Sequence, residues 1–173
     1  QKRLHVFLLF VLASFGSLTS GMAQCGTFYD GFETGTIVPQ WTFGTGSYTR
    51  TVPNTNSAVG TYHLQQSGSG NFYQGMYATF TPSQPTYISF WMRTDSTNAP
   101  NGYMVIGDGY VATDHGILFC YFNNTSQLRF VNNTGSNYNI TANTWYHVEA
   151  KNINWTTRTM DIWINNVLYL TAW

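Results

Sequence analysis

Charged side chains are scarce in this chain. Lysine, arginine, aspartate and glutamate together make up 8% of its 173 residues, whereas about 25% is usual for a globular protein. Seven basic residues balance seven acidic ones, and removing Lys2 and Arg3 with a leader would leave five against seven. No basic cluster is left that could hold nucleic acid or an anionic membrane surface, so we predict neither partner.

Long apolar runs are confined to the beginning of the chain. Lys2 and Arg3 precede a nearly continuous apolar stretch from Leu4 to Phe15, and small or polar residues follow up to Ala23. About 20 apolar residues are needed to cross a bilayer as a helix, and this stretch is shorter. We interpret residues 1–23 as a secretory signal peptide and predict a secreted or cell-surface protein with no membrane insertion after its removal.

Cysteine is limited to Cys25 and Cys120. Export would place both in an oxidising compartment, where a disulfide can form. Cys25 lies close to the expected mature terminus, so a bridge and two unpaired thiols are equally consistent with the sequence.

Helical periodicity is also missing beyond residue 23, and short strands take its place. The clearest strand, residues 145–152, alternates Tyr146, Val148 and Ala150 with a mixed face. Asn165-Asn166 is predicted to close a hairpin between residues 160–164 and 167–169, because asparagine tolerates a positive φ. Further strands are predicted at 27–32, 47–52, 61–66, 75–80, 87–94, 103–106, 116–122 and 127–131, with a loop at 67–71. We therefore predict that residues 24–173 form one all-β domain, an antiparallel two-sheet sandwich.

The hairpin region also carries a family resemblance. W-Y-H-V from Trp145, followed by I-W-I-N-N-V-L-Y, resembles the laminin G-like, concanavalin A-like jelly-roll domains, and F-E-x-G from Phe32 with Trp41 is similar to the opening of bacterial modules. The resemblance implies a jelly-roll fold in a bacterial secreted protein, without naming a ligand. Since Trp173 directly follows a hairpin, we expect the domain to be truncated at its C-terminus, with a further strand to cover that edge.

Catalytic motifs are absent. Glucanases of this superfold use E-x-D-x-x-E on one strand, because a retaining mechanism needs two carboxylates about 5 to 5.5 Å apart. Beyond residue 23, no two acidic residues are separated by two or four positions, and neither G-x-S-x-G nor H-E-x-x-H occurs. We predict a protein that is not an enzyme. A glycoside hydrolase or lyase whose acids converge from different strands is the second alternative.

Structural calcium is the cofactor that the resemblance implies, since jelly-roll modules often hold it near chain ends or in loops. Ca²⁺ binds six to eight oxygen ligands. Asp30 and Glu33 match the family's opening acids, and Asp108 and Asp114 border a loop with flexible glycines. Aspartates that only cap their own turns are the alternative.

Aromatic side chains are abundant, at 17% of the chain, and provide the candidate ligand-binding residues. Trp91 and Trp163 fall on the non-aliphatic faces of their strands, Tyr87 lies beside Trp91, and Tyr103 and Tyr110 lie in or near loops. Such rings pack against the C–H faces of sugars, although tryptophan more often covers a core. We predict a secreted, non-catalytic carbohydrate-binding or adhesion module whose partner is a glycan or cell-surface ligand. A structural or protein-interaction spacer domain of an adhesin is the first alternative.

Overall fold

The computed structural model describes residues 28–69, 74–97, 102–107, 116–131 and 135–173. Every regular element in these ranges is a β-strand, and all paired strands run antiparallel. Within the same ranges, no helix has the length and apolarity to cross a membrane. The predicted antiparallel all-β class is confirmed, whereas the predicted signal peptide lies outside the described residues. Gly31–Trp173 forms one compact unit.

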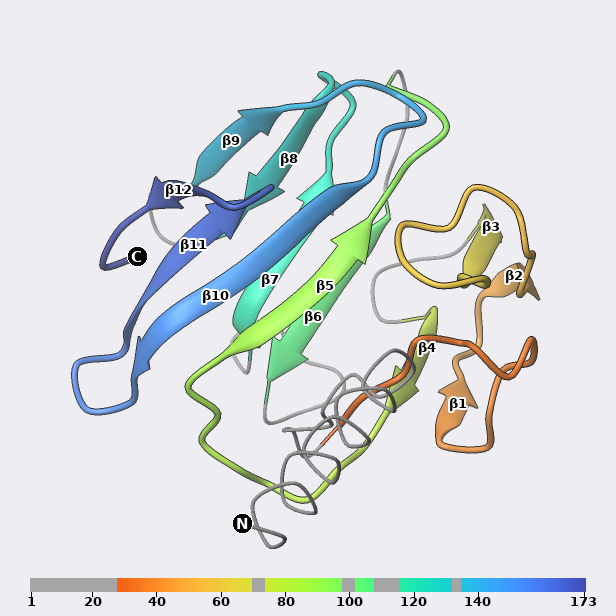
Figure 1. The fold of residues 1–173 in the computed structure, drawn as a ribbon, viewed down its shortest axis with the longest axis horizontal. Coiled ribbons are helices and arrows are strands. Elements are labelled where there is room, and N and C mark those ends of the chain that lie inside the picture. Colours follow the sequence, from red (N-terminus) through yellow and green to blue (C-terminus); the bar gives the residue numbers. More distant parts are fainter. Residues whose placement is uncertain (1–27, 70–73, 98–101, 108–115, 132–134) are drawn as a thin grey trace, which may run out of the picture. The chain divides into compact units, whose positions relative to one another are not determined.

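Two four-stranded sheets contain most of the strands (Figure 1). The first, which we call the β10 sheet, has the order β12 (Val167–Leu170), β11 (Thr159–Ile164), β10 (Tyr146–Asn154) and β5 (Ile88–Met92). The second, the β7 sheet, has the order β6 (Tyr103–Gly107), β7 (Gly116–Phe122), β8 (Gln127–Phe130) and β9 (Ser136–Asn139).

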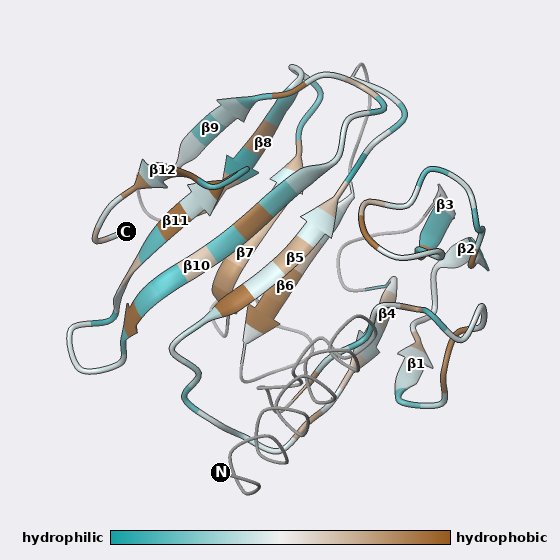
Figure 2. Ribbon diagram, in the orientation of Figure 1, coloured by the Kyte–Doolittle hydropathy of each residue, from teal (hydrophilic) through white to brown (hydrophobic). Residues whose placement is uncertain are grey.

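One hydrophobic core joins the two sheets. Val148, Ala150 and Ile162 of the β10 sheet are 0% exposed, as are Leu118 and Phe130 of the β7 sheet. Burying each such aliphatic or aromatic side chain stabilises the fold by about 1.5 to 3 kcal/mol. Polar and apolar bands alternate along β10 and β11 in Figure 2, as expected for strands with one inward face. The arrangement is sandwich-like, and the predicted inward side of residues 145–152 is confirmed.

The predicted turn between β11 and β12 is also confirmed. Asn165 and Asn166 have φ angles of 50° and 65°, the left-handed values that a tight hairpin demands. The turn is fixed to β10, because the Asn165 amide donates to the His147 carbonyl at 2.9 Å and the His147 amide donates to Asn165 Oδ1 at 2.9 Å. This contact holds the turn beside the first residues of β10.

Two smaller sheets complete the described strands. One pairs β1 (Trp41–Phe43) with β4 (Met76–Ala78), and the other pairs β2 (Ser47–Thr51) with β3 (Gln65–Ser69). Gly68 has a φ of 126°, and a Cβ at this position would clash with the Ser47 carbonyl oxygen. Glycine therefore allows β3 to approach β2 closely, and residues 67–69 of the predicted 67–71 loop belong to β3 instead.

The sequence also misjudged strands in the first half of the chain. Residues 28–32 form no strand; Phe32 has a φ of 59° and stacks on Trp41 with ring centroids 5.9 Å apart. Strand β3 begins four residues later than the predicted strand at 61–66. Strands β1 and β9 were not predicted; β1 has only three residues, and β9 is an Asn-rich edge strand that pairs with β8 alone.

Candidate functional site

The outer face of the β10 sheet carries a connected row of aromatic and polar side chains. In the strand register, Trp91 lies opposite His147, and Glu149 lies between Ser89 and Trp163. Side chains directly opposite each other on neighbouring strands share a face and are close enough to interact. We call the set on this face the outer ladder: Tyr87, Trp91, His147, Glu149, Lys151 and Trp163.

Trp91 stacks on His147, with ring centroids 4.5 Å apart and planes 11° apart. Trp91 lies on the edge strand β5 and is 40% exposed, whereas His147 is half-buried. Burial lowers the pKa of the His147 imidazole and the Lys151 ammonium acts in the same direction, while the Glu149 carboxylate opposes them. His147 is therefore mostly neutral at pH 7, and it offers Trp91 an uncharged ring as a support.

Glu149 is the centre of the outer ladder. Although it points away from the core, it is only 4% exposed. Tyr87 donates its hydroxyl proton to Glu149 Oε1 at 2.9 Å, Lys151 Nζ lies 3.0 Å from the same oxygen, and His147 Nδ1 lies 3.8 Å from Oε2. Burial raises the pKa of this carboxyl, but the Lys151 and Tyr87 hydrogen bonds and the Lys151 charge outweigh burial and lower it. Glu149 is thus a carboxylate at neutral pH.

Trp163 differs from Trp91 in how its ring is covered. The Lys151 ammonium lies 4.5 Å from the centre of the Trp163 ring, in a cation–π contact. The indole Nε1 of Trp163 is buried and donates no hydrogen bond within the described part of the chain. Of the two predicted tryptophans, Trp91 has the more accessible ring.

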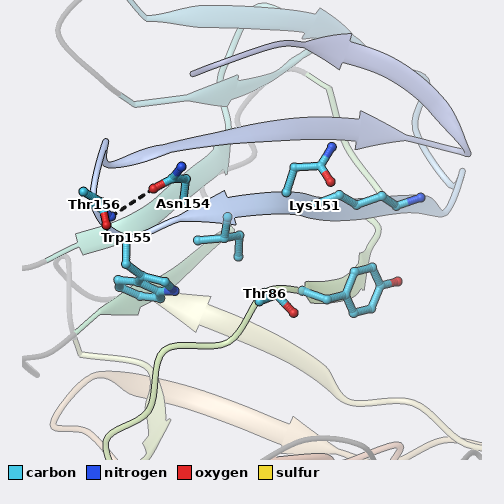
Figure 3. A pocket seen from close by; sticks show the side chains of 8 residues that line it. Thr86, Lys151, Asn154, Trp155 and Thr156 are labelled. Atoms are coloured by element: carbon cyan, nitrogen blue, oxygen red, sulfur yellow. Dashed lines mark hydrogen bonds between the residues drawn. The ribbon is translucent and has the colours of Figure 1, made fainter.

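An open hollow of about 740 Å³ adjoins the ladder and shares Tyr87 and Lys151 with it. It arises where the pairing of β10 with β11 is irregular, because the register shifts between Lys151 and Asn154 and Asn152 has a φ of 54°. Figure 3 shows Trp155 at one end of the hollow, Lys151 at the other and Thr86 between them. Its lining consists of Thr86, Tyr87, Lys151, Asn152, Ile153, Asn154, Trp155 and Thr156.

Local hydrogen bonds fix the far end of the hollow. Trp155 Nε1 donates to the Pro85 carbonyl at 3.0 Å, which joins the β10–β11 turn to the segment before β5. Asn154 Oδ1 accepts hydrogen bonds from the amides of Thr156 and Thr157, each at 3.0 Å. The aromatic wall is therefore held in place before any ligand arrives.

No family model, curated protein or solved structure matches this chain. The ladder and the hollow are therefore the basis for assigning a function. The sequence pointed to Trp91, Trp163 and Tyr87, and the structure brings these three onto one face. The sequence also placed Glu149 on the mixed face of its strand, but neither its central position nor the hollow could be predicted, because both depend on contacts between β5, β10 and β11.

The other predicted binding residues lie elsewhere. Tyr103 is on β6 of the β7 sheet, where its ring meets Phe119 with centroids 6.1 Å apart, so it does not join Trp91. Tyr110 lies outside the described residues. Cys120 is buried, and its Sγ donates to Met92 Sδ at 3.6 Å. Since Cys25 lies outside the described residues, the disulfide stays a prediction.

Of the predicted calcium ligands, the structure describes Asp30 and Glu33. Glu33 accepts hydrogen bonds from the Thr61 amide, at 3.0 Å to Oε2, and from the Tyr62 amide, at 3.3 Å to Oε1. Where the structure describes the chain, no group of three or more histidine, cysteine, aspartate or glutamate residues could hold a metal ion. The predicted loop ligands Asp108 and Asp114 fall outside those ranges, so calcium stays a prediction.

Proposed function

We propose that the protein is a secreted, non-catalytic carbohydrate-binding module with a jelly-roll fold. The single observation that carries this proposal is the exposed ring of Trp91, supported from one side by the neutral His147 ring and flanked by a polar network. A sugar ring can pack its C–H face on such an indole while its hydroxyls hydrogen-bond to neighbouring polar groups. The resemblance to concanavalin A-like modules points to the same class.

The charges of the ladder favour an uncharged ligand. Lys151 and Glu149 lie 3.0 Å apart and compensate each other. The Glu149 carboxylate is almost fully buried, so it presents little charge to a ligand. A hydroxyl-rich, neutral sugar fits this surface better than a phosphate or a basic peptide.

The states of Glu149 and Asp161 support binding without catalysis. A glycosidase needs a protonated acid beside a second carboxyl group. The pKa of Glu149 is lowered by its hydrogen bonds, so it does not supply a proton at neutral pH. Asp161 accepts hydrogen bonds from Asn152 at 2.8 Å and from Thr171 and the Ala172 amide, each at 3.0 Å, so it holds the C-terminal residues.

Retention on immobilised polysaccharides, after a glycan array, tests the proposal. We expect Trp91→Ala to weaken retention by several-fold to about tenfold, because an aromatic contact contributes about 0.5 to 1.5 kcal/mol. Phe43→Ala is the matched control, since Phe43 is a 56%-exposed aromatic on a different sheet. Equal retention of both variants would contradict a site at Trp91.

Structural calcium is a separate part of the proposal, because it rests on the resemblance alone. If the protein binds calcium, dialysis against a chelator lowers the midpoint of thermal unfolding, and added Ca²⁺ restores it. An unchanged midpoint would contradict the proposed calcium binding and leave the proposed sugar site unaffected.

The alternative function, a protein-interaction spacer, has one observation in its favour. Val167 and Leu168 are 67% and 47% exposed on β12, an edge strand whose unpaired backbone can accept another strand. An array that retains no glycan, together with self-association that Val167→Lys removes, would favour this function.

A further inference from the structure

We propose that the hollow is a second subsite of the same binding site, so that the protein takes an extended chain of uncharged sugars and not a single sugar. The chain would run from Trp91, past Ser89 and Tyr87, into the hollow. This inference rests on the proposed carbohydrate-binding function and specifies which form of carbohydrate it takes.

The spacing of the exposed residues along β5 sets the length of the ligand. Tyr87, Ser89 and Trp91 are exposed, whereas Ile88 and Phe90 between them are half-buried and pack against the core. Residues four positions apart in an extended strand are separated by about 13 Å. One sugar ring is too short to touch both Trp91 and Tyr87, but consecutive units of an oligosaccharide can reach both.

Tyr87 connects the two subsites. Its side chain lines the hollow, and its hydroxyl donates to Glu149 Oε1 at 2.9 Å. Tyr87 is nevertheless 49% exposed, so the hydrogen bond orients a ring that remains open to a ligand. Burial, and the hydrogen bond to the nearby Glu149 carboxylate, raise the pKa of Tyr87, which keeps the hydroxyl protonated as the donor. A ring fixed before binding loses little entropy when the ligand arrives.

The lining of the hollow fits a sugar. Thr86, Asn152, Asn154 and Thr156 bring hydroxyl and amide groups to it, and Trp155 forms an aromatic wall held by Pro85. Lys151 is the one charged residue among the eight that line it, and Glu149 at 3.0 Å compensates that charge. Aromatic walls with a few placed polar groups are typical of small-molecule sites, and the compensated charge favours a neutral one.

Calorimetric titration with gluco-, xylo- and manno-oligosaccharides of one to six units tests the inference. We expect affinity for the retained series to increase with chain length and then reach a plateau. Thr86→Tyr should obstruct part of the hollow beside Tyr87 and reduce the affinity for the long oligosaccharides towards that for the short ones, while the affinity for the short ones stays unchanged. Thr86→Ser, which leaves the hollow open, is the control.

Some outcomes would overturn the extended site alone, and others would overturn the carbohydrate-binding function as well. A single sugar that binds as tightly as the hexamer would overturn the extended site but leave the carbohydrate-binding function standing. Equal affinities of Thr86→Tyr and Thr86→Ser for the hexamer would do the same. No binding to any series, with no glycan retained on the array, would overturn both.

Tyr87 provides a second test that does not depend on the hollow being filled. Tyr87→Phe keeps the ring and loses the hydroxyl, whereas Tyr87→Ala loses both. We expect Tyr87→Ala to lower hexamer affinity more than Tyr87→Phe does, with short oligosaccharides affected least. Hexamer affinity that is unchanged in Tyr87→Ala would remove Tyr87 from the path of the chain.

Discussion

Val148 and Glu149 are neighbours on β10, and both are buried although their side chains point to opposite faces of the sheet. Val148 is covered by the apolar side chains of the core. Glu149 is covered by the outer ladder, and Tyr87, Lys151 and His147 lie near its two oxygens. The inner face is held by hydrophobic packing and the outer face by mutually compensating polar groups, so substitutions on the two faces should behave differently.

The largest effect is expected on the inner face. Ile162→Ala removes a side chain that is 0% exposed and leaves a cavity, which should lower the free energy of unfolding by about 2 to 5 kcal/mol. Urea titration measures the change. Val167→Ala, at a 67%-exposed position of the neighbouring strand, should stay within about 0.5 kcal/mol of the wild type. Similar losses in the two variants would contradict the core assignment.

On the outer face, Glu149→Ala should lower the free energy of unfolding by less than Ile162→Ala does. It leaves the Tyr87 hydroxyl and the Lys151 ammonium without their shared acceptor, and a loss of this kind costs about 1 to 3 kcal/mol. The lower end applies, because Lys151 is 31% exposed and water can solvate it.

A double-mutant cycle with Lys151→Met separates the pair from its surroundings. If Glu149 and Lys151 compensate each other, the double variant loses less stability than the sum of the single variants. Additive losses would mean that the two side chains act independently.

Acid should lower the stability of the fold, in part through His147 on the outer face. The pKa of His147 is lowered from 6.5 in the folded state, so the unfolded chain binds more protons and stability falls as the pH drops below about 6.5. Burial, and then the Arg93 charge, lower the pKa of His63. His63 therefore also makes the stability fall as the pH drops. Urea midpoints at pH 8, 6.5 and 5.5 should decrease in that order, and His147→Gln should reduce the slope. An unchanged slope in this variant would assign the pH dependence to other groups.

The sequence predicted more about the inner face of the β10 sheet than about its outer face. The alternation of Tyr146, Val148 and Ala150 identified the inward side of β10, because apolar periodicity is a local property of the sequence. Alternation in residues 87–94 and 160–164 likewise placed Trp91 and Trp163 on outward faces, but it did not predict which of the two rings is more accessible. Their difference depends on Lys151, which lies over one ring, and on His147, which stacks on the other. These are cross-strand contacts, and strand register has to be known before they can be predicted.

In the first half of the chain, the glycine-rich segment around Gly68 was predicted incorrectly. Gly68 was interpreted as part of a loop, because glycine is depleted from strands. Its φ of 126° and its contact with the Ser47 carbonyl show that it serves a close backbone approach instead. Composition alone does not separate these two uses of glycine.

The smallest expected effect is at Trp163. Trp163→Phe keeps an aromatic ring beneath the Lys151 ammonium but removes the buried Nε1, which has no hydrogen-bond partner among the described residues. The weaker cation–π contact of phenylalanine destabilises the fold, while removal of an unsatisfied buried donor stabilises it, and each effect is about 1 kcal/mol. We therefore expect a net change below about 1 kcal/mol in urea titration, with glycan retention unchanged. A strong loss of retention in Trp163→Phe would move the sugar site from Trp91 towards the centre of the sheet.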